Sequence, residues 1–354
     1  MSYTVMEISQ ALNIPYEGDG GIRVVSISSP ENARPDQMVI ATSTKYFGEL
    51  KNTKALVAFM YNGADWKALG LKAALLPDQP RFKMSEVFNM YDKNGPLDPI
   101  IHDTAIIDPS AKIGENVSIG AYCVIGKGVT IGKETFLDTN ISIADNCFIG
   151  NNSLIFSGVK VSTGVTIGSN FRCSFNTVIG SDGFSFVSSA DDNIKEIKRS
   201  LGKRRGTNQS KYSRIASFGS VDIGDDVEIG SNCSIDSGTI KNTIVGDGTK
   251  IDNLVHIGHN VEIGADTLLC GQVGIAGSAI IGNRVVLAGQ CGVGDHTKVG
   301  DDVIAGGATK IFSNIPKGRV VLGNPAMKMD ENIKVYKSIR RLPRFMEKIN
   351  QKKL

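Results

Sequence analysis

Four histidines are the first candidates for chemistry in this chain of 354 residues. Imidazole gains and loses a proton near neutral pH, so a histidine can act as a general base. His102 falls in a linker with two prolines and is interpreted as a solvated loop residue. His256, His259 and His296 lie in the C-terminal half of the chain. A catalytic site would therefore form around these three.

The elements that carry these histidines repeat every six residues. An aliphatic residue, often followed by glycine, recurs from Ile101 to Ile179 and from Ile223 to Ile311, with one change of register between Ser237 and Asn242. A period of six fits neither an amphipathic helix nor an alternating strand. It predicts a mainly β fold, a left-handed parallel β-helix in which three repeats close one triangular coil. We expect nine to ten coils, about 46 Å in length, with the glycine relieving each corner.

The repeat also assigns an inward and an outward direction to each position. The position four residues after each repeat start is the second inward one, and it holds small residues. Four of the six cysteines (Cys123, Cys147, Cys233 and Cys291) occupy this position, which favours buried packing over a reactive thiol. No C-x-x-C pair indicates a zinc ribbon, and no disulfide framework is expected.

On this prism, residues 18 apart stack one above another, which relates His259 to Gly277. His259 is the second residue after a repeat start, so its side chain is expected to point outward. Gly277 follows one coil later on the same face, where no side chain shields its N–H. His296 comes two coils after His259 with an offset of one residue. In this arrangement the His259 imidazole could act as a base, and the Gly277 N–H could donate a hydrogen bond to an oxyanion.

Two neighbouring residues have two interpretations each. His256 is expected on a different side of its strand, with a structural or trimer-facing role. Asp252 follows a repeat start and could orient a histidine across a subunit boundary. It could equally be a corner residue that satisfies backbone donors.

The chain is expected to fold as three parts. Residues 1–98 lack the repeat and are interpreted as a small α/β domain with a helix near Val5 to Leu12, and 94–105 form the hinge. Residues 99–325 form the β-helix, interrupted by an inserted loop at about 184–217. Residues 326–354 form a helical extension, with Asp330 as its cap and Pro343 ending or kinking it. This tail is expected to cover the last coil.

Composition excludes several function classes. The net charge of +3 and the 21% of charged residues argue against a nucleic-acid binder or a membrane-coating polycation. No run of 18 apolar residues predicts a transmembrane segment. The first ten residues, MSYTVMEISQ, do not resemble a signal peptide, so a cytoplasmic location is expected.

Four motifs resemble a known family over nearly the whole chain. They are IGSDGF (179–184), VEIGSNCSID (227–236), KIDNLVHIGHNVEIG (250–264) and CGQVGIAGSAIIG (270–282). Together with the N-terminal domain and the C-terminal helix, they are similar to the UDP-3-O-(3-hydroxyacyl)glucosamine N-acyltransferases of lipid A synthesis.

The resemblance implies a homotrimer with active sites in grooves between neighbouring prisms. The acyl donor would be a thioester on acyl carrier protein and the acceptor the amine of a UDP-sugar. No cofactor belongs to the enzyme itself, because phosphopantetheine arrives on the carrier. Carried onto this chain, the catalytic residues are His259 as the base, His296 as a second important histidine, Gly277 as the oxyanion amide and Asp252 as the acidic residue.

The resemblance also implies binding residues. Tyr46 matches an aromatic that contacts uracil, while Ser43 and Ile40 stand where the family has Asn and Phe, and Asn253 lies in the IDN segment. Lys310 and Phe312 occupy the positions at which, in the family, side chains set the length of the acyl chain that is accepted. The basic residues of the C-terminal helix are expected to bind carrier protein: Lys334, Lys337, Arg340, Arg341 and Arg344. The basic run 186–214 is either a solvated loop or a second docking surface for the carrier.

Two rival functions stay open from the sequence. The segment VVLGNPAMKM (320–329) is also similar to the β-helix exit of acetyl-CoA-dependent N-acetyltransferases that act on nucleotide amino sugars. A metal hydratase on the same kind of prism would bind zinc with three histidines. His256 and His259 are three apart on a strand of period two, so they are expected to face opposite sides and not to share a metal.

Overall fold

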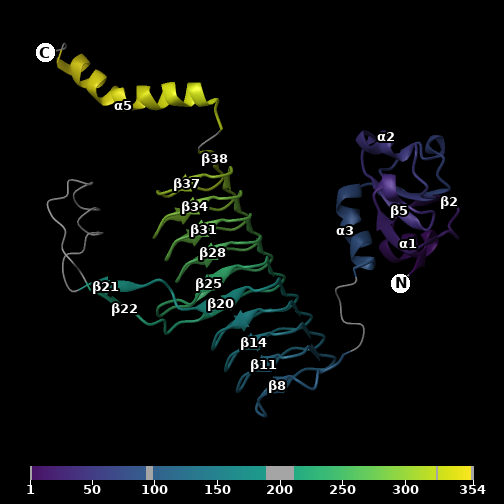
Figure 1. Ribbon diagram of the computed structural model, residues 1–354, viewed down its shortest axis with the longest axis horizontal. Helices are drawn as coiled ribbons and strands as arrows, with labels where there is room; N and C mark the ends of the chain where they lie inside the picture. Colours follow the sequence, from purple (N-terminus) through teal and green to yellow (C-terminus); the bar gives the residue numbers. More distant parts are fainter. Residues whose placement is uncertain (1, 93–98, 189–210, 324–325, 352–354) are drawn as a thin grey trace. The chain divides into compact units, whose positions relative to one another are not determined.

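The computed structural model describes residues 2–92, 99–188, 211–323 and 326–351 (Figure 1). The chain divides into two compact units, Met1–Gly95 and Pro96–Leu354. None of the helices in the described ranges is long and apolar enough to cross a membrane.

The N-terminal unit is an α/β domain built on a five-stranded sheet in the order β2-β7-β6-β5-β4. Strand β2 is antiparallel to β7 and the other neighbours are parallel. A separate antiparallel pair joins β1 to β3. The strands are β1 (Tyr3–Thr4), β2 (Tyr16–Gly18), β3 (Arg23–Val24), β4 (Ser26–Ser28), β5 (Gln37–Ala41), β6 (Val57–Met60) and β7 (Ala73–Leu75). The α-helices are α1 (Val5–Leu12), α2 (Phe47–Leu50) and α3 (Pro80–Met90), and the 3-10 helices are η1 (Pro30–Asn32), η2 (Thr44–Tyr46) and η3 (Lys67–Leu69).

Helix α1 confirms the expected helix at Val5 to Leu12 and shows why it starts there. The Thr4 side chain accepts a hydrogen bond from Glu7 N, and the Glu7 side chain accepts one from Thr4 N. This capping box satisfies two backbone donors that the first turn would otherwise leave unpaired. The central strand β6 alternates between two apolar clusters, with Ala58 and Met60 in one and Val57 and Phe59 in the other. The sheet is therefore buried on both faces.

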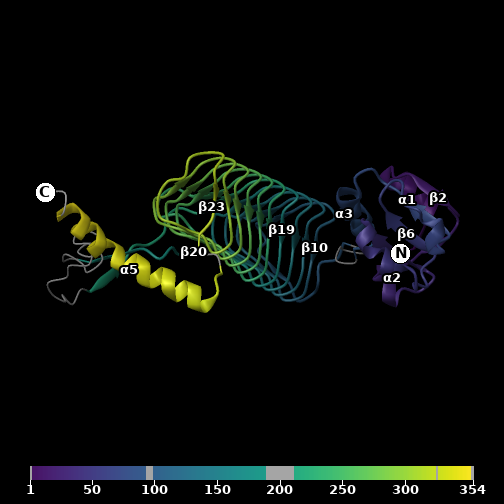
Figure 2. The same ribbon diagram turned by 90° about the horizontal axis from the view of Figure 1, so that it is seen from above.

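The second unit confirms the parallel β-helix. Strands 18 residues apart pair in parallel, and three sheets of ten, ten and nine strands form the sides of a prism (Figures 1 and 2). Face 1 comprises β10 (Ser118–Ile119), β13 (Phe136–Leu137), β16 (Leu154–Ile155), β19 (Arg172–Cys173), β24 (Glu228–Ile229), β27 (Lys250–Ile251), β30 (Leu268–Leu269), β33 (Val286–Leu287), β36 (Ile304–Ala305) and β38 (Val320–Val321). Face 2 comprises β8 (Ile106–Ile107), β11 (Val124–Ile125), β14 (Ser142–Ile143), β17 (Lys160–Val161), β20 (Val178–Ser181), β25 (Ser234–Asp236), β28 (His256–Ile257), β31 (Gly274–Ile275), β34 (Gly292–Val293) and β37 (Lys310–Ile311). Face 3 comprises β9 (Lys112–Ile113), β12 (Thr130–Ile131), β15 (Phe148–Ile149), β18 (Thr166–Ile167), β23 (Val221–Ile223), β26 (Thr243–Val245), β29 (Glu262–Ile263), β32 (Ile280–Ile281) and β35 (Lys298–Val299).

The interior of the prism contains both predicted sets of inward residues. One continuous apolar cluster runs from Val117 to Ile311. The four cysteines at the second inward position are buried, as predicted. Burial raises the pKa of the thiols of Cys147 and Cys233, which disfavours the reactive thiolate.

The structure corrects the expectation that glycine relieves the turn at each corner. Apart from Gly180 (φ 90°), the described glycines that directly follow a repeat start do not take the left-handed conformation. A Cβ on Gly114 would instead lie 2.6 Å from Lys133 N in the next coil, so glycine is required by the close stacking of coils. The left-handed residue comes two positions later, and in many coils it is asparagine, as at Asn146 (φ 58°). Asparagine tolerates this region better than other residues with a Cβ.

Two segments interrupt the regular coils near the middle of the prism. Residues 182–220 separate β20 from β23, and β21 (Phe186–Ser188) pairs with β22 (Tyr212–Arg214) as an antiparallel ribbon (Figure 1). The predicted register change at Ser237 to Asn242 is the loop between β25 and β26. It brings Ser234 opposite His256, 22 residues apart instead of 18.

The C-terminal helix differs from the prediction in two ways. Helix α5 (Met329–Gln351) begins before Asp330, so this residue lies in the first turn and not at the cap. Of the two outcomes predicted for Pro343, an end or a kink, the helix excludes the end, because it continues to Gln351. None of its described residues is buried, and Tyr336, Ile339 and Phe345 are all exposed, so the helix does not bury its apolar side against the last coil.

Candidate active site

A groove on face 2 brings the histidines of the C-terminal half together. Its volume is about 510 Å³, and strands β25, β28, β31 and β34 and the corners that follow them form its floor. The lining residues are Phe184, Asp236, His256, Gly258, His259, Gly274, Ile275, Ala276, Gly277, Val293, Asp295 and His296. The predicted association of His259, Gly277 and His296 is thus present within one chain.

Asn260 holds the imidazole of His259. The Asn260 side-chain oxygen lies 3.0 Å from His259 Nδ1 and also accepts a hydrogen bond from Thr239 N. The Asn260 amide nitrogen donates to Lys241 O at 2.9 Å. Thr239 and Lys241 belong to the loop that interrupts the repeat. The change of register in the sequence therefore builds the support for the histidine beside it.

These contacts decide which imidazole nitrogen is basic. Thr239 N–H requires an acceptor and Lys241 O requires a donor, so the orientation of the Asn260 carboxamide is fixed. Because the Asn260 oxygen can only accept, His259 Nδ1 must carry a hydrogen. In the neutral ring, Nε2 then has the free lone pair. His259 is therefore in the tautomer that a general base in this groove requires.

Two glycines confine the ring on either side. A Cβ on Gly277 would lie 2.7 Å from His259 Nε2, and a Cβ on Gly183 would lie 2.6 Å from His259 Cβ. At several other corners this outward position holds Asp or Asn, as at Asn283, whose side chain caps a backbone N–H one coil earlier. Gly277 removes that side chain and leaves space beside Nε2. The basic nitrogen and the Gly277 backbone consequently face the same opening.

His296 and His256 border the same groove. His296 is an exposed corner residue whose N–H donates to Gly277 O at 3.2 Å. The expectation that His256 lies on a different side was wrong: it lines the groove with His259. The period of two holds only for the two-residue strand β28, and the chain turns a corner between the two histidines. His256 Nε2 also lies 3.9 Å from Asp236 Oδ2.

Comparison with known proteins decides the family. UDP-3-O-acylglucosamine N-acyltransferases from Ruegeria pomeroyi and Paracoccus denitrificans are 43% and 46% identical to this chain, in each case over 78% of the chain and 76% of the relative. The chain belongs to this family of N-acyltransferases. Residues 242–277 match the bacterial transferase hexapeptide family (six repeats), and 97–183 match the GMPPB C-terminal domain. A crystal structure of the Arabidopsis UDP-N-acetylglucosamine acyltransferase, 25% identical, covers 63% of this chain and 71% of its own at a TM-score of 0.52.

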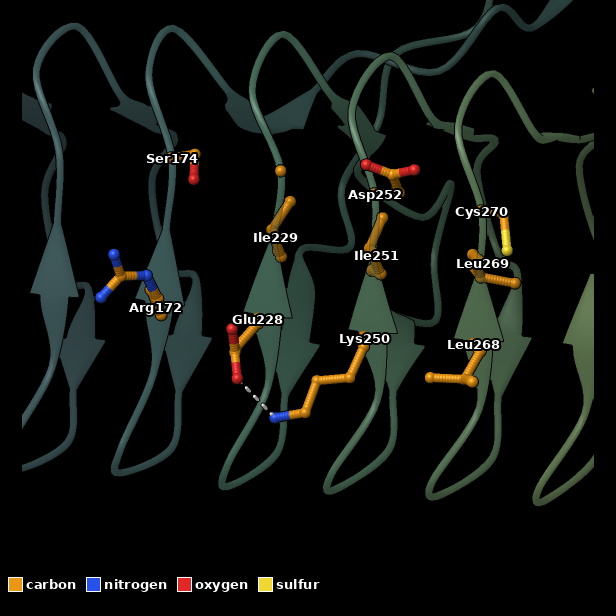
Figure 3. Close-up of a pocket in the computed structure, with 11 residues that line it drawn as sticks. Arg172, Ser174, Glu228, Ile229, Lys250, Ile251, Asp252, Leu268, Leu269 and Cys270 are labelled. Atoms are coloured by element: carbon orange, nitrogen blue, oxygen red, sulfur yellow. Dashed lines mark ion pairs between the residues drawn. The ribbon is translucent and has the colours of Figure 1, made fainter. Parts of the chain in front are cut away.

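In this N-acyltransferase, Asp252 and Asn253 lie on face 1 and not in the His259 groove. They follow β27, beside a second pocket of about 420 Å³ that Asp252 lines. Figure 3 shows Asp252 at the corner that follows its strand, as Ser174 and Cys270 are in other coils, and above the ion pair between Lys250 and Glu228 (3.0 Å). Asn253 Oδ1 accepts from Ser231 N at 2.6 Å, which is the corner-capping interaction. Within one chain, Asp252 therefore lies in a different pocket from His259.

The predicted nucleotide-binding residues lie in the N-terminal unit. Tyr46 is in η2 with 38% of its surface exposed, and Ser43 precedes this helix. Ile40 is in β5 and packs against the apolar cluster that contains Phe59. Tyr46 and Ser43 are thus available at one end of β5, whereas the Ile40 side chain contributes to the core.

The predicted carrier-binding residues lie on α5, and all five are exposed. In the basic run, Lys195, Lys198, Arg199, Lys203, Arg204 and Arg205 lie outside the described residues. Arg214 is described, and its guanidinium lies 4.6 Å from the centre of the Phe186 ring. This contact links the two strands of the β21–β22 ribbon close to Phe184.

The described ranges contain no group of three or more His, Cys, Asp or Glu side chains arranged to hold a metal ion. The groove contains other groups: the His259 imidazole with its basic Nε2, the Gly277 backbone that faces the same opening, and the buried carboxylate of Asp236. These groups can accept a proton and stabilise an oxyanion, the two requirements of acyl transfer to an amine.

Sequence reasoning missed several residues of this groove. Asn260 directly follows His259, and its contacts could be inferred only with knowledge of where the 237–242 loop lies. Gly183 and Phe184 end the IGSDGF motif, and Asp236 ends VEIGSNCSID. The motifs therefore contained the signal, although hexapeptide spacing alone could not separate these residues from ordinary corner positions.

Proposed function

We propose that this N-acyltransferase transfers a 3-hydroxyacyl group from acyl carrier protein to the 2-amine of UDP-3-O-acylglucosamine, a step of lipid A synthesis. The observation that carries the proposal is the pairing of His259 with Asn260, which leaves Nε2 as a base beside the Gly277 backbone. The acceptor is the one named for relatives that are 43% and 46% identical. The location that we propose for the reaction is the cytoplasm.

In the proposed mechanism, the amine attacks the thioester carbonyl while His259 Nε2 accepts its proton. The Nδ1–H donated to Asn260 keeps the resulting imidazolium in position. The Gly277 N–H stabilises the oxyanion, an interaction whose loss typically costs about 3 kcal/mol. When the tetrahedral intermediate collapses, the imidazolium returns the proton to the leaving thiolate. His296, at the edge of the same groove, contacts the donor or the sugar.

We propose a homotrimer that completes the groove with a second copy. On face 2, Gly274 and Gly292 have no atom within 4 Å of the position that a Cβ would take, so the floor above His259 is open. On face 1 of this part of the prism, Leu268 and Ile304 are exposed apolar residues. Packing face 1 of one copy against face 2 of the next would cover the glycine floor with this apolar column, enclose an acyl chain and bring Asp252 toward the partner's base.

The proposed acyl chain runs from Gly277 along the glycine floor toward Lys310 and Phe312. Lys310 is the outward residue of β37, the last strand of face 2, and Phe312 follows it with 80% of its surface exposed. These two side chains end the strip of glycines. They are the residues that we expect to limit acyl length.

The remaining contacts follow the chemistry of the substrates. Tyr46 presents an aromatic face for the uracil ring, with Ser43 beside it as a hydrogen-bonding group. On α5, the basic residues Lys334, Lys337, Arg340, Arg341 and Arg344 offer an exposed positive surface for an acidic carrier protein. The donor carries phosphopantetheine to the site, so the enzyme needs no cofactor of its own.

A donor competition tests this function. Purified protein is given UDP-3-O-acylglucosamine with 3-hydroxyacyl carrier protein, acetyl-CoA or both, and N-acylated products are identified by mass spectrometry. We expect 3-hydroxyacyl transfer from the carrier even in the presence of excess acetyl-CoA. Preferred acetylation would instead identify the acetyl-CoA-dependent N-acetyltransferase, and no N-acylation from any donor would reject the proposed acceptor.

A further inference from the structure

Asp236 and His256 form a pair of a carboxylate and an imidazole in the active-site groove, and the mechanism above does not use this pair. Asp236 Oδ2 lies 3.9 Å from His256 Nε2, and the Asp236 side chain has only 7% of its surface exposed. Ser181 Oγ donates to Asp236 Oδ1 at 2.8 Å, which holds the carboxylate in place. All of this lies beside His259, because Asp236 and His256 both line the same groove.

Burial of this carboxylate requires a compensating partner. A carboxylate removed from water is unfavourable unless hydrogen bonds or a positive charge stabilise it. Ser181 supplies one hydrogen bond, and a positive charge next to the carboxylate would come from a protonated His256, 3.9 Å away, or from a cationic group of a ligand. With 53% of its side chain exposed, His256 can exchange protons with solvent.

The amine acceptor must lose two protons, and a single base cannot accept both. Aliphatic amines are largely protonated near neutral pH, and an ammonium group has no lone pair for attack. One proton must leave before the nitrogen attacks, and a second must leave as the amide forms. His259 has one free lone pair, on Nε2, and a His259 that took the first proton could not take the second.

We propose that Asp236 and His256 form a second proton-accepting site that binds the acceptor as its ammonium ion and removes the first proton. The Asp236 carboxylate attracts the ammonium and then stabilises the imidazolium on His256. His259 takes the second proton and returns it to the thiolate. Overall, the ammonium and the thioester give an amide, a thiol and one proton, and His256 releases that proton to solvent. Asp236 and His256 are both catalytic residues in this scheme, because Asp236 binds the ammonium group and His256 accepts its proton.

This inference rests on the proposed amine acceptor, and the test uses two acceptors that differ only in basicity. One is UDP-3-O-acylglucosamine. The other is its 2-hydroxylamino analogue, whose weakly basic nitrogen is already unprotonated at neutral pH. His256→Gln and Asp236→Asn keep the approximate size of the side chains, and His102→Gln is the matched control because His102 is exposed in the linker.

We expect His256→Gln and Asp236→Asn to lower kcat/KM for the amine acceptor by roughly 10- to 100-fold. With the hydroxylamino acceptor, both variants should stay within about threefold of wild type, and His102→Gln should match wild type with both. An equal fall with both acceptors would overturn the proposal, because it would mean that the pair only shapes the groove. Unchanged rates with the amine would also overturn it. If wild type acylates neither acceptor, the proposed function fails as well.

Discussion

His259 Nδ1 and Asn260 Oδ1 lie 3.0 Å apart, and this contact between sequence neighbours sets the chemistry of the groove. It works because the loop at 237–242 binds both ends of the Asn260 carboxamide. Asn260→Ala should therefore leave the fold intact and lower kcat by roughly 10- to 100-fold, since the imidazole loses its tautomer and orientation. Steady-state kinetics measure this, with thermal unfolding as the control. A variant as active as wild type would show that Asn260 does not orient the base.

The glycines around His259 give a steric prediction. Gly277→Ala places a methyl group 2.7 Å from His259 Nε2, and Gly183→Ala places one 2.6 Å from His259 Cβ. Both should lower kcat about 100-fold or more, because a misplaced base cannot reach the amine. Gly48→Ala serves as the control, since a Cβ there has no atom within 4 Å. Gly277→Ala or Gly183→Ala with wild-type kcat would contradict the position assigned to the ring.

The basic surface of α5 gives a prediction about the donor. Charge reversal of Lys334, Lys337 and Arg341 to Glu should raise KM for the acyl carrier protein donor about tenfold and remove its salt dependence. An acyl-pantetheine donor, which lacks the carrier, should be used as well as by wild type. Reversal of Lys112, Lys127 and Lys133 in the first coils is the control. Equal effects of both triple variants would indicate a general charge effect and reject docking on α5.

The buried thiols predict a loss of stability at alkaline pH. Burial raises the pKa of Cys233, so its contribution to stability is complete below the ordinary thiol pKa of about 8.5 and is lost as pH rises through the folded-state value. The free energy of unfolding should fall by up to about 1.4 kcal/mol per pH unit for each such thiol. Cys233→Val, which copies Val227 and Val255 at the equivalent position, should fall less steeply in urea titrations between pH 8 and 10. Identical slopes for variant and wild type would refute this.

The sequence predicts the β-helix well because its determinants are local and repeated. An apolar residue every six positions defines the inward side of each strand, and the 18-residue stacking of Ile119 on Leu137 follows from three repeats to a coil. The same stacking placed His259, Gly277 and His296 on one groove. These inferences need only the average geometry of a coil.

Inferences that depended on departures from the repeat were less successful. His256 was placed on the wrong side because alternation ends with the two-residue strand, and the chain turns before His259. The support from Asn260 could not be predicted because Thr239 and Lys241 belong to an irregular loop. Irregular backbone places these groups, and no periodic rule describes it.

The most direct test is the rate of 3-hydroxyacyl transfer from carrier protein to UDP-3-O-acylglucosamine, with wild type and His259→Ala measured side by side. Substitution removes the imidazole whose Nε2 faces Gly277, so we predict robust transfer by wild type and a fall of roughly 100-fold or more in kcat for the variant, with unchanged folding. A His259→Ala variant that retains wild-type kcat would contradict the assignment of the base.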